Sequence, residues 1–337
     1  MAVKSMKWTY LENHNGIEIQ EDIRTLDEED YKELRQLLFE HLIVVFRKQE
    51  PSSYEFGRMC HHIGHKGIGN WHHLNWYSNG EERYPGLEGV PRGRKLIDQG
   101  YQDPADYVDC KEKFPVQRVT GSKNKTGVPT GIFGGAKLTW HSNINGWSSN
   151  DGVGLQGWDN SQNTCTEFLN TARCRETIDP QLLEVLGKTW FQWKENLENW
   201  SDGLEINKSK TGASRSAVQN SGWVGIYKLW FLQQNRADVK GFYFHFLNDY
   251  TVHSPDPNIV EIIKDFAFKD EYKYIHWWEP GDIVLMDQLI TLHQRGKLTQ
   301  ETNNKRVLHR FEFALSNYDN YLRAQNVIIP GRNVEKY

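Results

Sequence analysis

The sequence predicts a mainly β fold with flanking helices (α+β), built around a β-sandwich or barrel. Short segments rich in β-branched and aromatic residues, bounded by turn formers, recur through the second half of the chain. Amphipathic helix patterns are concentrated near the N-terminus. Long excursions separate the short strands, which argues against a doubly wound parallel sheet. The 337 residues, of which 38% are hydrophobic, are enough to bury a sizeable core.

A helix followed by a strand opens the chain. Thr25 and Glu28 have the spacing of a capping box, and apolar residues at helical spacing come after them. The sequence therefore predicts an amphipathic helix that begins at this point. Residues 42–46, LIVVF, form a short β-branched run bounded by charged residues, which is typical of a buried strand.

A second helix is expected directly afterwards, and a long irregular region follows it. Ser52 or Ser53 can cap this helix and Gly64 can end it. Its inner stripe consists of Phe56, Met59, Cys60 and Ile63. Residues 66–130 are rich in glycine, proline and aspartate and are too long for a passive connection, so we expect a loop region that covers the active site.

The rest of the chain is mostly strand-like, with two helices among the strands. One helix is expected to start at Asp179-Pro180, with proline at its first position, and a shorter one at Asp256-Pro257. The first of these carries Leu183, Leu186 and Trp190. The predicted strands are 152–158, 164–171, 241–247, 282–288 and 306–315.

Charge and composition exclude two classes of partner. The net charge of −4 gives no basic field for nucleic acid, and the longest apolar runs are strand-sized, so no membrane role is expected. The first ten residues lack the apolar region of a secretory signal, and the cysteines show no CxxC spacing. We expect a cytoplasmic protein with free thiols that acts on a small molecule, and the sequence leaves its oligomeric state open. The cysteines are Cys60, Cys110, Cys165 and Cys174.

Two histidines and an arginine have the order and spacing of an iron site. A facial triad needs an HxD or HxE motif and a distant histidine; His141, in LTWHSNINGW, fits the first ligand and His293 fits the second. Arg306 follows on a strand that alternates basic and apolar residues, where its guanidinium can clamp a dicarboxylate. A single histidine is more often an ordinary surface or core residue. The order of all three features is what indicates a site.

These segments resemble the taurine catabolism dioxygenase family of Fe(II)/2-oxoglutarate-dependent oxygenases. Residues 16–49, ending in VVFRKQ, resemble the family's entry helix and strand, which ends in "vvFRgQ". WEPGDIVLMDQLITLH resembles the block "W.pGD...wDNr...H", and KRVLHR resembles the final arginine strand. The resemblance is weak over 66–130 and 195–240, which we expect to serve this protein's own substrate. It implies a double-stranded β-helix (jelly-roll) core in a single oxygenase domain, 1–337.

The resemblance also implies roles for individual residues. His141 and His293 would bind Fe(II), and Arg306 would bind the distal carboxylate of 2-oxoglutarate. Arg310 resembles the family arginine that faces an anionic substrate or supports the co-substrate. Thr166 corresponds to the family threonine that hydrogen-bonds 2-oxoglutarate, the alternative being an ordinary strand threonine. The pair before the distal histidine is expected to be structural: Asp287 and Gln288.

The chain departs from the family at Asn143, where the family has aspartate. The amide is isosteric but offers a metal only a neutral oxygen, which weakens the site by several kcal/mol in rough terms. Three alternatives stay open. Asn143 can be a weak ligand, it can turn away and leave its position to water, halide or a carboxylate such as Asp151 or Glu167, or the site can be inactive. Direct ligation is preferred.

The reaction that the resemblance implies uses Fe(II), 2-oxoglutarate and O2, and proceeds by hydrogen abstraction at a ferryl. We expect hydroxylation of a polar or anionic small molecule. Halogenation ranks lower, because related halogenases have Gly or Ala where this chain has Asn143, and asparagine does not open the same room. A catalytically inactive ligand-binding relative is the second alternative, against which the retained histidines and arginine argue. Candidates for substrate contact are Trp71, His73, Trp76 and Arg310.

Overall fold

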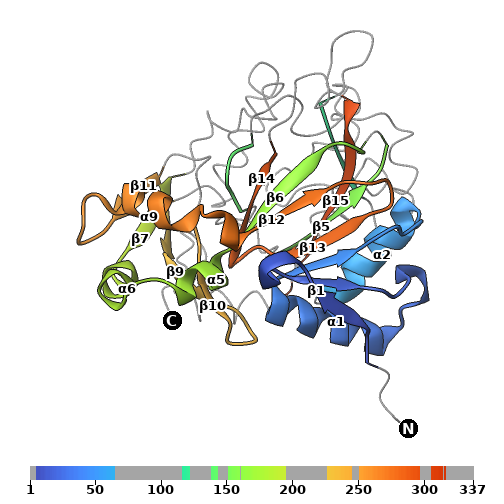
Figure 1. The fold of residues 1–337 in the computed structure, drawn as a ribbon, viewed down its shortest axis with the longest axis horizontal. Coiled ribbons are helices and arrows are strands. Elements are labelled where there is room, and N and C mark those ends of the chain that lie inside the picture. Colours follow the sequence, from blue (N-terminus) through green and yellow to red (C-terminus); the bar gives the residue numbers. More distant parts are fainter. Residues whose placement is uncertain are drawn as a thin grey trace, which may run out of the picture.

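The computed structural model describes residues 5–64, 116–121, 138–142, 151–159, 161–194, 226–244, 250–296, 305–313 and 315. These residues form a mainly β fold with flanking helices, as the sequence predicts (Figure 1). Within them, no helix combines the length and the apolar character that crossing a bilayer requires. Cys60, Cys165 and Cys174 are free thiols, as expected, and Cys110 lies outside the described residues.

A seven-stranded sheet forms the centre of the molecule. All of its neighbouring strands are antiparallel except β2 and β3, which are parallel. In spatial order its strands are β1 (Trp8–Tyr10), β2 (Ile17–Ile19), β3 (Ile43–Phe46), β13 (Ile283–Asp287), β5 (Gly152–Gly157), β15 (Val307–Phe313) and β4 (Gln117–Thr120).

Three smaller sheets accompany it. An antiparallel three-stranded sheet has the order β12 (Lys273–Trp277), β6 (Cys165–Asn170), β14 (Thr291–Arg295). A second has the order β11 (Tyr250–His253), β7 (Trp190–Lys194), β8 (Ile226–Trp230), and β10 (Lys240–Phe242) pairs with β9 (Leu232–Gln234). The first of these three sheets carries the distal histidine and is the one that matters for the site.

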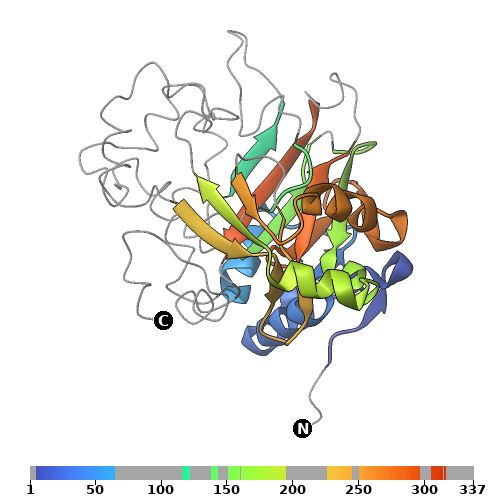
Figure 2. The same cartoon turned by 90° about the vertical axis from the view of Figure 1, so that its left-hand side faces the viewer.

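The helices lie in two groups. Helices α1 (Glu28–His41) and α2 (Ser53–Ile63) pack on the large sheet, while α5 (Thr171–Glu176), α6 (Pro180–Gly187) and α9 (Ile259–Ala267) lie on the other side of the molecule (Figures 1 and 2). Short 3-10 turns complete the described elements: η1 (Glu12–His14), η2 (Ile23–Thr25) and η5 (Asp270–Tyr272).

The large sheet is buried on both faces. Ile283 and Leu285 of β13 belong to the core beneath α1 and α2, while Val284 and Met286 belong to the second core. Because side chains alternate along a strand, burial of both faces explains why β3 and β13 read as continuous apolar runs. Each such side chain, fully buried, contributes roughly 1.5–3 kcal/mol relative to an exposed one.

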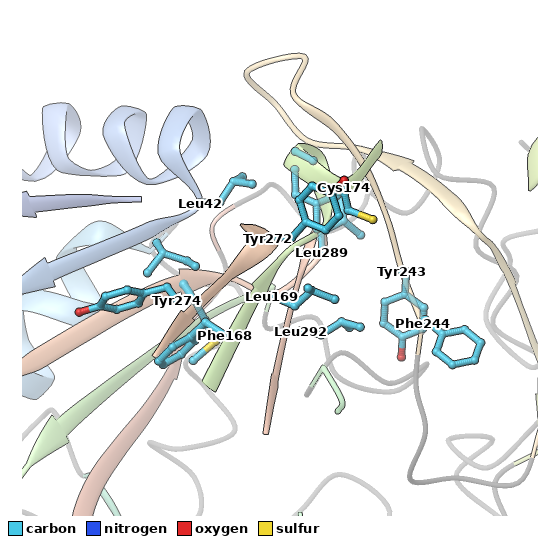
Figure 3. Packing of buried hydrophobic residues seen from close by; sticks show 14 of the residues in the cluster. Leu42, Phe168, Leu169, Cys174, Tyr243, Phe244, Tyr272, Tyr274, Leu289 and Leu292 are labelled. Carbon is cyan, nitrogen blue, oxygen red and sulfur yellow. The ribbon is translucent and has the colours of Figure 1, made fainter. Parts of the chain in front are cut away.

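The second core reaches the three-stranded sheet. Figure 3 shows Phe168 of β6 beside Tyr274 of β12, and their ring centroids are 6.2 Å apart. Leu169 of β6 and Leu292 of β14 are register partners in the same cluster. This packing fixes β14 against β6 and thereby fixes the strand that carries His293.

The N-terminal caps agree with the prediction at one helix and not at the other. Ser52 caps α2, and Gly64 ends it, as predicted. The prediction for α1 was wrong by two residues: its capping box joins Asp27 and Asp30, and Thr25 belongs to the preceding turn, where its hydroxyl donates to the Asp22 carbonyl. Aspartate serves as well as threonine at such a cap, so Thr25 with Glu28 and Asp27 with Asp30 both have the spacing of a capping box.

Three other boundaries differ from the sequence prediction, and one predicted loop region contains a strand. Helix α6 ends at Gly187, so Trp190 begins β7 instead, where it stacks on His253 with centroids 3.8 Å apart. Helix α9 starts at Ile259, after an Asn258 cap. Within 241–247, the described strand ends at Phe242. The predicted loop region 66–130 contains β4, which pairs with β15; whether that region covers the active site stays a prediction.

Replacing Asp27 with alanine is expected to lower the free energy of unfolding by about 1 kcal/mol. The Asp27 carboxylate accepts from the backbone N–H groups of Glu29 and Asp30 at 2.9 and 3.0 Å, and both donors would lose that partner. The matched control is Thr25→Ala, for which we expect less than about 0.5 kcal/mol. Urea unfolding measures both, and a larger loss for the Thr25 variant would contradict the assigned cap.

Candidate active site

A backbone bridge holds His141 against His293. The N–H of each residue donates to the carbonyl of the other at 2.9 Å, which forms an isolated antiparallel bridge beside β14. The two imidazole centroids are 4.2 Å apart and both residues are buried. Two segments far apart in the sequence therefore present their imidazoles side by side.

The His141 ring has a defined tautomer. Its Nδ1 lies 2.6 Å from the carbonyl oxygen of Thr139, and because a carbonyl only accepts, Nδ1 carries the hydrogen. Burial, with a smaller contribution from the positive charges of Arg310 and Arg295, lowers the pKa of His141 to about 4. The imidazole is thus neutral at pH 7, and Nε2 keeps a lone pair for a metal.

The short segment that carries His141 is fixed at three points. Trp140 stacks on Phe268 after α9, with centroids 5.4 Å apart. The Ser142 hydroxyl donates to the Gln288 carbonyl at 2.7 Å, and Leu138 accepts from the Arg295 N–H at 3.0 Å. These contacts hold the first histidine without a regular strand of its own.

Both imidazoles line a cavity that is rich in arginine. Side chains from β6, β14 and β15 surround it, so most of the wall belongs to well-paired strands. The polar residues of the wall are His141, His293, Thr166, Gln294, Arg295, Arg306 and Arg310, and the apolar ones are Val119, Leu138, Leu155 and Leu308. The cavity combines nitrogen ligands with cationic groups, which suits a metal and an anion together.

Arg306 is the most deeply buried cation of this wall, with 4% of its surface exposed. Its Nη1 donates to the Cys165 carbonyl at 3.1 Å, and no carboxylate among the described residues forms an ion pair with it. Burial lowers the pKa of Arg306 to about 9. The charge is retained at pH 7 at an energetic cost, which an anion in the cavity would offset.

Arg310, on β15, lines the same cavity as Arg306, the residue before that strand, and has a carboxylate beside it. Its guanidinium forms an ion pair with Glu312, two residues further along the strand. The sequence prediction had Arg310 facing an anionic substrate or supporting the co-substrate, and it did not consider this glutamate. The pair makes this part of the site less positive than the arginine alone would.

Thr166 is oriented by a tryptophan. The indole Nε1 of Trp278 donates to the Thr166 hydroxyl at 2.9 Å. Because an indole N–H can only donate, the hydroxyl is the acceptor here and keeps its own hydrogen for a partner in the cavity. This arrangement suits a threonine that donates to a carboxylate. No local sequence pattern indicates the contact, because Trp278 and Thr166 meet only through the pairing of β12 with β6.

Neither carboxylate considered as a replacement ligand lines the cavity. Asp151 accepts from the Leu315 N–H at 2.6 Å, and Glu167 accepts from Gln294 at 2.7 Å. The structure therefore gives that alternative no support. Across the described ranges, no group of three histidine, cysteine or acidic residues gathers in a way that could hold a metal. Asn143, Trp71, His73 and Trp76 lie outside the described residues, so their roles stay predictions.

The turn before β14 is built around Asp287. Its carboxylate accepts from the Leu289 N–H and from the Asn235 amide, both at 2.9 Å. Burial, and then the negative charge of Asp151, raise the pKa of Asp287 to about 7, against the effect of these hydrogen bonds. Arg295, by contrast, lines the cavity two residues after His293, and the sequence prediction missed it because β14 was not recognised as a strand.

The fold is that of a class of solved oxygenase structures. The chain is similar over 94% of its length to 99% of AAD-2, solved with Mn(II) and N-oxalylglycine, with a TM-score of 0.63 and 15% identity. A taurine dioxygenase from Burkholderia xenovorans gives a TM-score of 0.58 at 14% identity, covering 92% of this chain and 91% of that one. PvcB, an Fe, alpha-ketoglutarate dependent oxygenase, gives 0.55 at 13%, covering 93% of both chains. The sequence matches no protein-family model and no curated protein.

The raised pKa of Asp287 predicts a pH dependence of stability. As pH rises from about 3.8, the carboxyl ionises in the unfolded chain, but in the folded protein it ionises only near pH 7. Stability contributed by the protonated acid is therefore lost across this interval, by roughly 4 kcal/mol at most. Asp287→Asn cannot titrate, so its unfolding free energy should fall less between pH 4.5 and 7.5. Urea unfolding at several pH values measures both proteins. An equal fall in unfolding free energy with pH for the two would contradict the assignment.

Proposed function

We propose that this protein is an Fe(II)- and 2-oxoglutarate-dependent oxygenase that hydroxylates a polar or anionic small molecule. The observation that carries the proposal is the buried histidine pair, which opens into the same cavity as the buried guanidinium of Arg306. The fold supports it, since similar structures include one with Mn(II) and N-oxalylglycine and one named as an Fe, alpha-ketoglutarate dependent oxygenase. We propose a cytoplasmic location and no nucleic-acid or membrane partner, from composition alone.

We further propose that the two sheets beside the cavity form a double-stranded β-helix. Strands β5 and β6 lie in the large and the small sheet respectively, and β13, β14 and β15 again alternate between the two. Alternation of successive strands between two facing sheets is how a jelly roll is built. The arrangement supports this architecture and would leave the cavity between the sheets.

The residues present fit an Fe(II) centre, though with one anionic ligand fewer than a facial triad. His141 and His293 would hold the metal through their imidazoles, with Asn143 as a neutral third ligand. When bound, Fe(II) and 2-oxoglutarate supply the activation of O2, with release of succinate and CO2 and hydroxylation of a C–H bond of the substrate. The tautomer of His141 leaves its Nε2 available for the metal without loss of a proton.

The other cavity residues would bind and orient 2-oxoglutarate and the substrate. Arg306 would pair with the distal carboxylate of 2-oxoglutarate, and the Thr166 hydroxyl would donate to the same group. Leu155 and Leu308 line the cavity as apolar walls that limit access of water. Arg310 lines the cavity and Glu312 partly offsets its charge, which suits a substrate with polar groups.

Arg306→Gln is expected to raise the 2-oxoglutarate concentration for half-maximal succinate release at least tenfold, or about 1.4 kcal/mol. The reason is the loss of a charge-assisted partner for a buried carboxylate. Lys305→Gln is the matched control, because it removes a neighbouring cation that is exposed. An unchanged requirement in the Arg306 variant would contradict this role.

Asn143→Asp is expected to tighten Fe(II) binding by at least tenfold, about 1.4 kcal/mol, since it adds an anionic oxygen in the same volume. Anaerobic Fe(II) titration of both proteins measures the change, and succinate release and substrate mass report the reaction. The natural protein should bind iron more weakly and still release succinate. Absence of both in the natural protein, with both restored by the aspartate, would establish an inactive relative; a product that gained chlorine would establish a halogenase.

A further inference from the structure

Arg295 is a cavity residue that the triad and the Arg306 clamp do not account for. It lies on β14 two residues after His293, and alternation along a strand places both side chains on the same face. Its register partner on β6 is Thr166, which also lines the cavity. Arg295, Thr166 and His293 thus face one cavity from two paired strands.

Arg295 and Arg306 line the same cavity, close enough for their charges to interact. The positive charge of Arg295 adds to burial in lowering the pKa of Arg306. Arg306 also donates to the carbonyl of Cys165, the residue before Thr166. Two guanidiniums and a hydroxyl with an available hydrogen therefore gather at the same place, and like charges brought together under burial favour an anion between them.

The strand register places Arg295 and Thr166 one same-face step from His293. Same-face neighbours on a strand are about 6.6 Å apart, and Arg295 and Thr166 stand one such step from the register pair of His293 and Phe168. A dicarboxylate with its 2-oxo acid group held at the histidines could carry its distal carboxylate to Arg295 and Thr166. Arg310 of β15 follows Arg306 by four residues, about 13 Å in extended chain, and so serves another part of the cavity.

We infer that Arg295 is a second guanidinium for the distal carboxylate of the co-substrate, which it holds together with Arg306 and Thr166. The inference rests on the proposed function, because it concerns the same co-substrate. Two planar forks on one carboxylate select 2-oxo acids that end in a carboxylate over those that do not. Arg295 is then a specificity-determining residue for the co-substrate.

The test is a calorimetric titration of N-oxalylglycine into the full chain in saturating Mn(II). Arg295→Gln should weaken N-oxalylglycine at least tenfold compared with the natural protein. Oxalate, which keeps the chelating end and lacks the distal carboxylate, is the control ligand, and its affinity should change less than twofold. Arg295→Lys keeps the charge but not the fork, so it should weaken N-oxalylglycine several-fold and leave oxalate unchanged.

Two results would overturn the inference. Unchanged N-oxalylglycine binding in the glutamine variant is one, and an equal loss for both ligands, which indicates a structural role, is the other. If the glutamine variant does not fold, the lysine variant decides by the same two criteria. Arg306→Gln separates the two proposals: if it alone loses N-oxalylglycine, the proposed function stands without Arg295, whereas a natural protein that binds no N-oxalylglycine loses both.

Discussion

The candidate site depends on the two backbone hydrogen bonds between His141 and His293. They fix the separation of the imidazoles before any metal or ligand is bound, and they tie a short segment without regular structure to a strand of the small sheet. That strand is itself held by β6, whose Phe168 and Leu169 are anchored in the core. Core packing is thus transmitted to the site through one paired strand, which is how a scaffold preorganises reactive groups.

The electrostatics of the cavity follow from burial. His141 is neutral because protonation in this surrounding is costly, while Arg306 and Arg295, with pKa values lowered to about 9 and about 10, stay charged at neutral pH. A wall of this kind is unfavourable for the folded protein alone and favourable for an anionic guest. Part of the binding energy of the guest is therefore present in the protein as electrostatic strain, a common property of preorganised sites.

Features that depend on neighbouring residues in the sequence could be predicted, whereas contacts that depend on strand pairing could not. Ser52 was identifiable as a cap because its partner lies three residues away, and the alternation of β15 placed Arg306 and Arg310 on one face. The role of Trp278 toward Thr166 was not predictable, because the two residues meet only after β12 pairs with β6. Arg295 was missed for the same reason: the short run 291–295 becomes a recognisable strand only when β6 is beside it.

The strict alternation along β15 constrains how this chain can change over evolution. Even-numbered positions from Arg306 to Arg310 supply the cavity, while Phe311 and Phe313 complete the core under α1 and α2. A single-residue insertion or deletion within the strand would exchange these two sets of side chains, burying arginines among apolar residues and turning phenylalanines toward the cavity. Substitutions at the cavity positions leave the core under α1 and α2 untouched. The ligands that the cavity accepts can therefore change by substitution of side chains, while insertions and deletions in this strand are selected against.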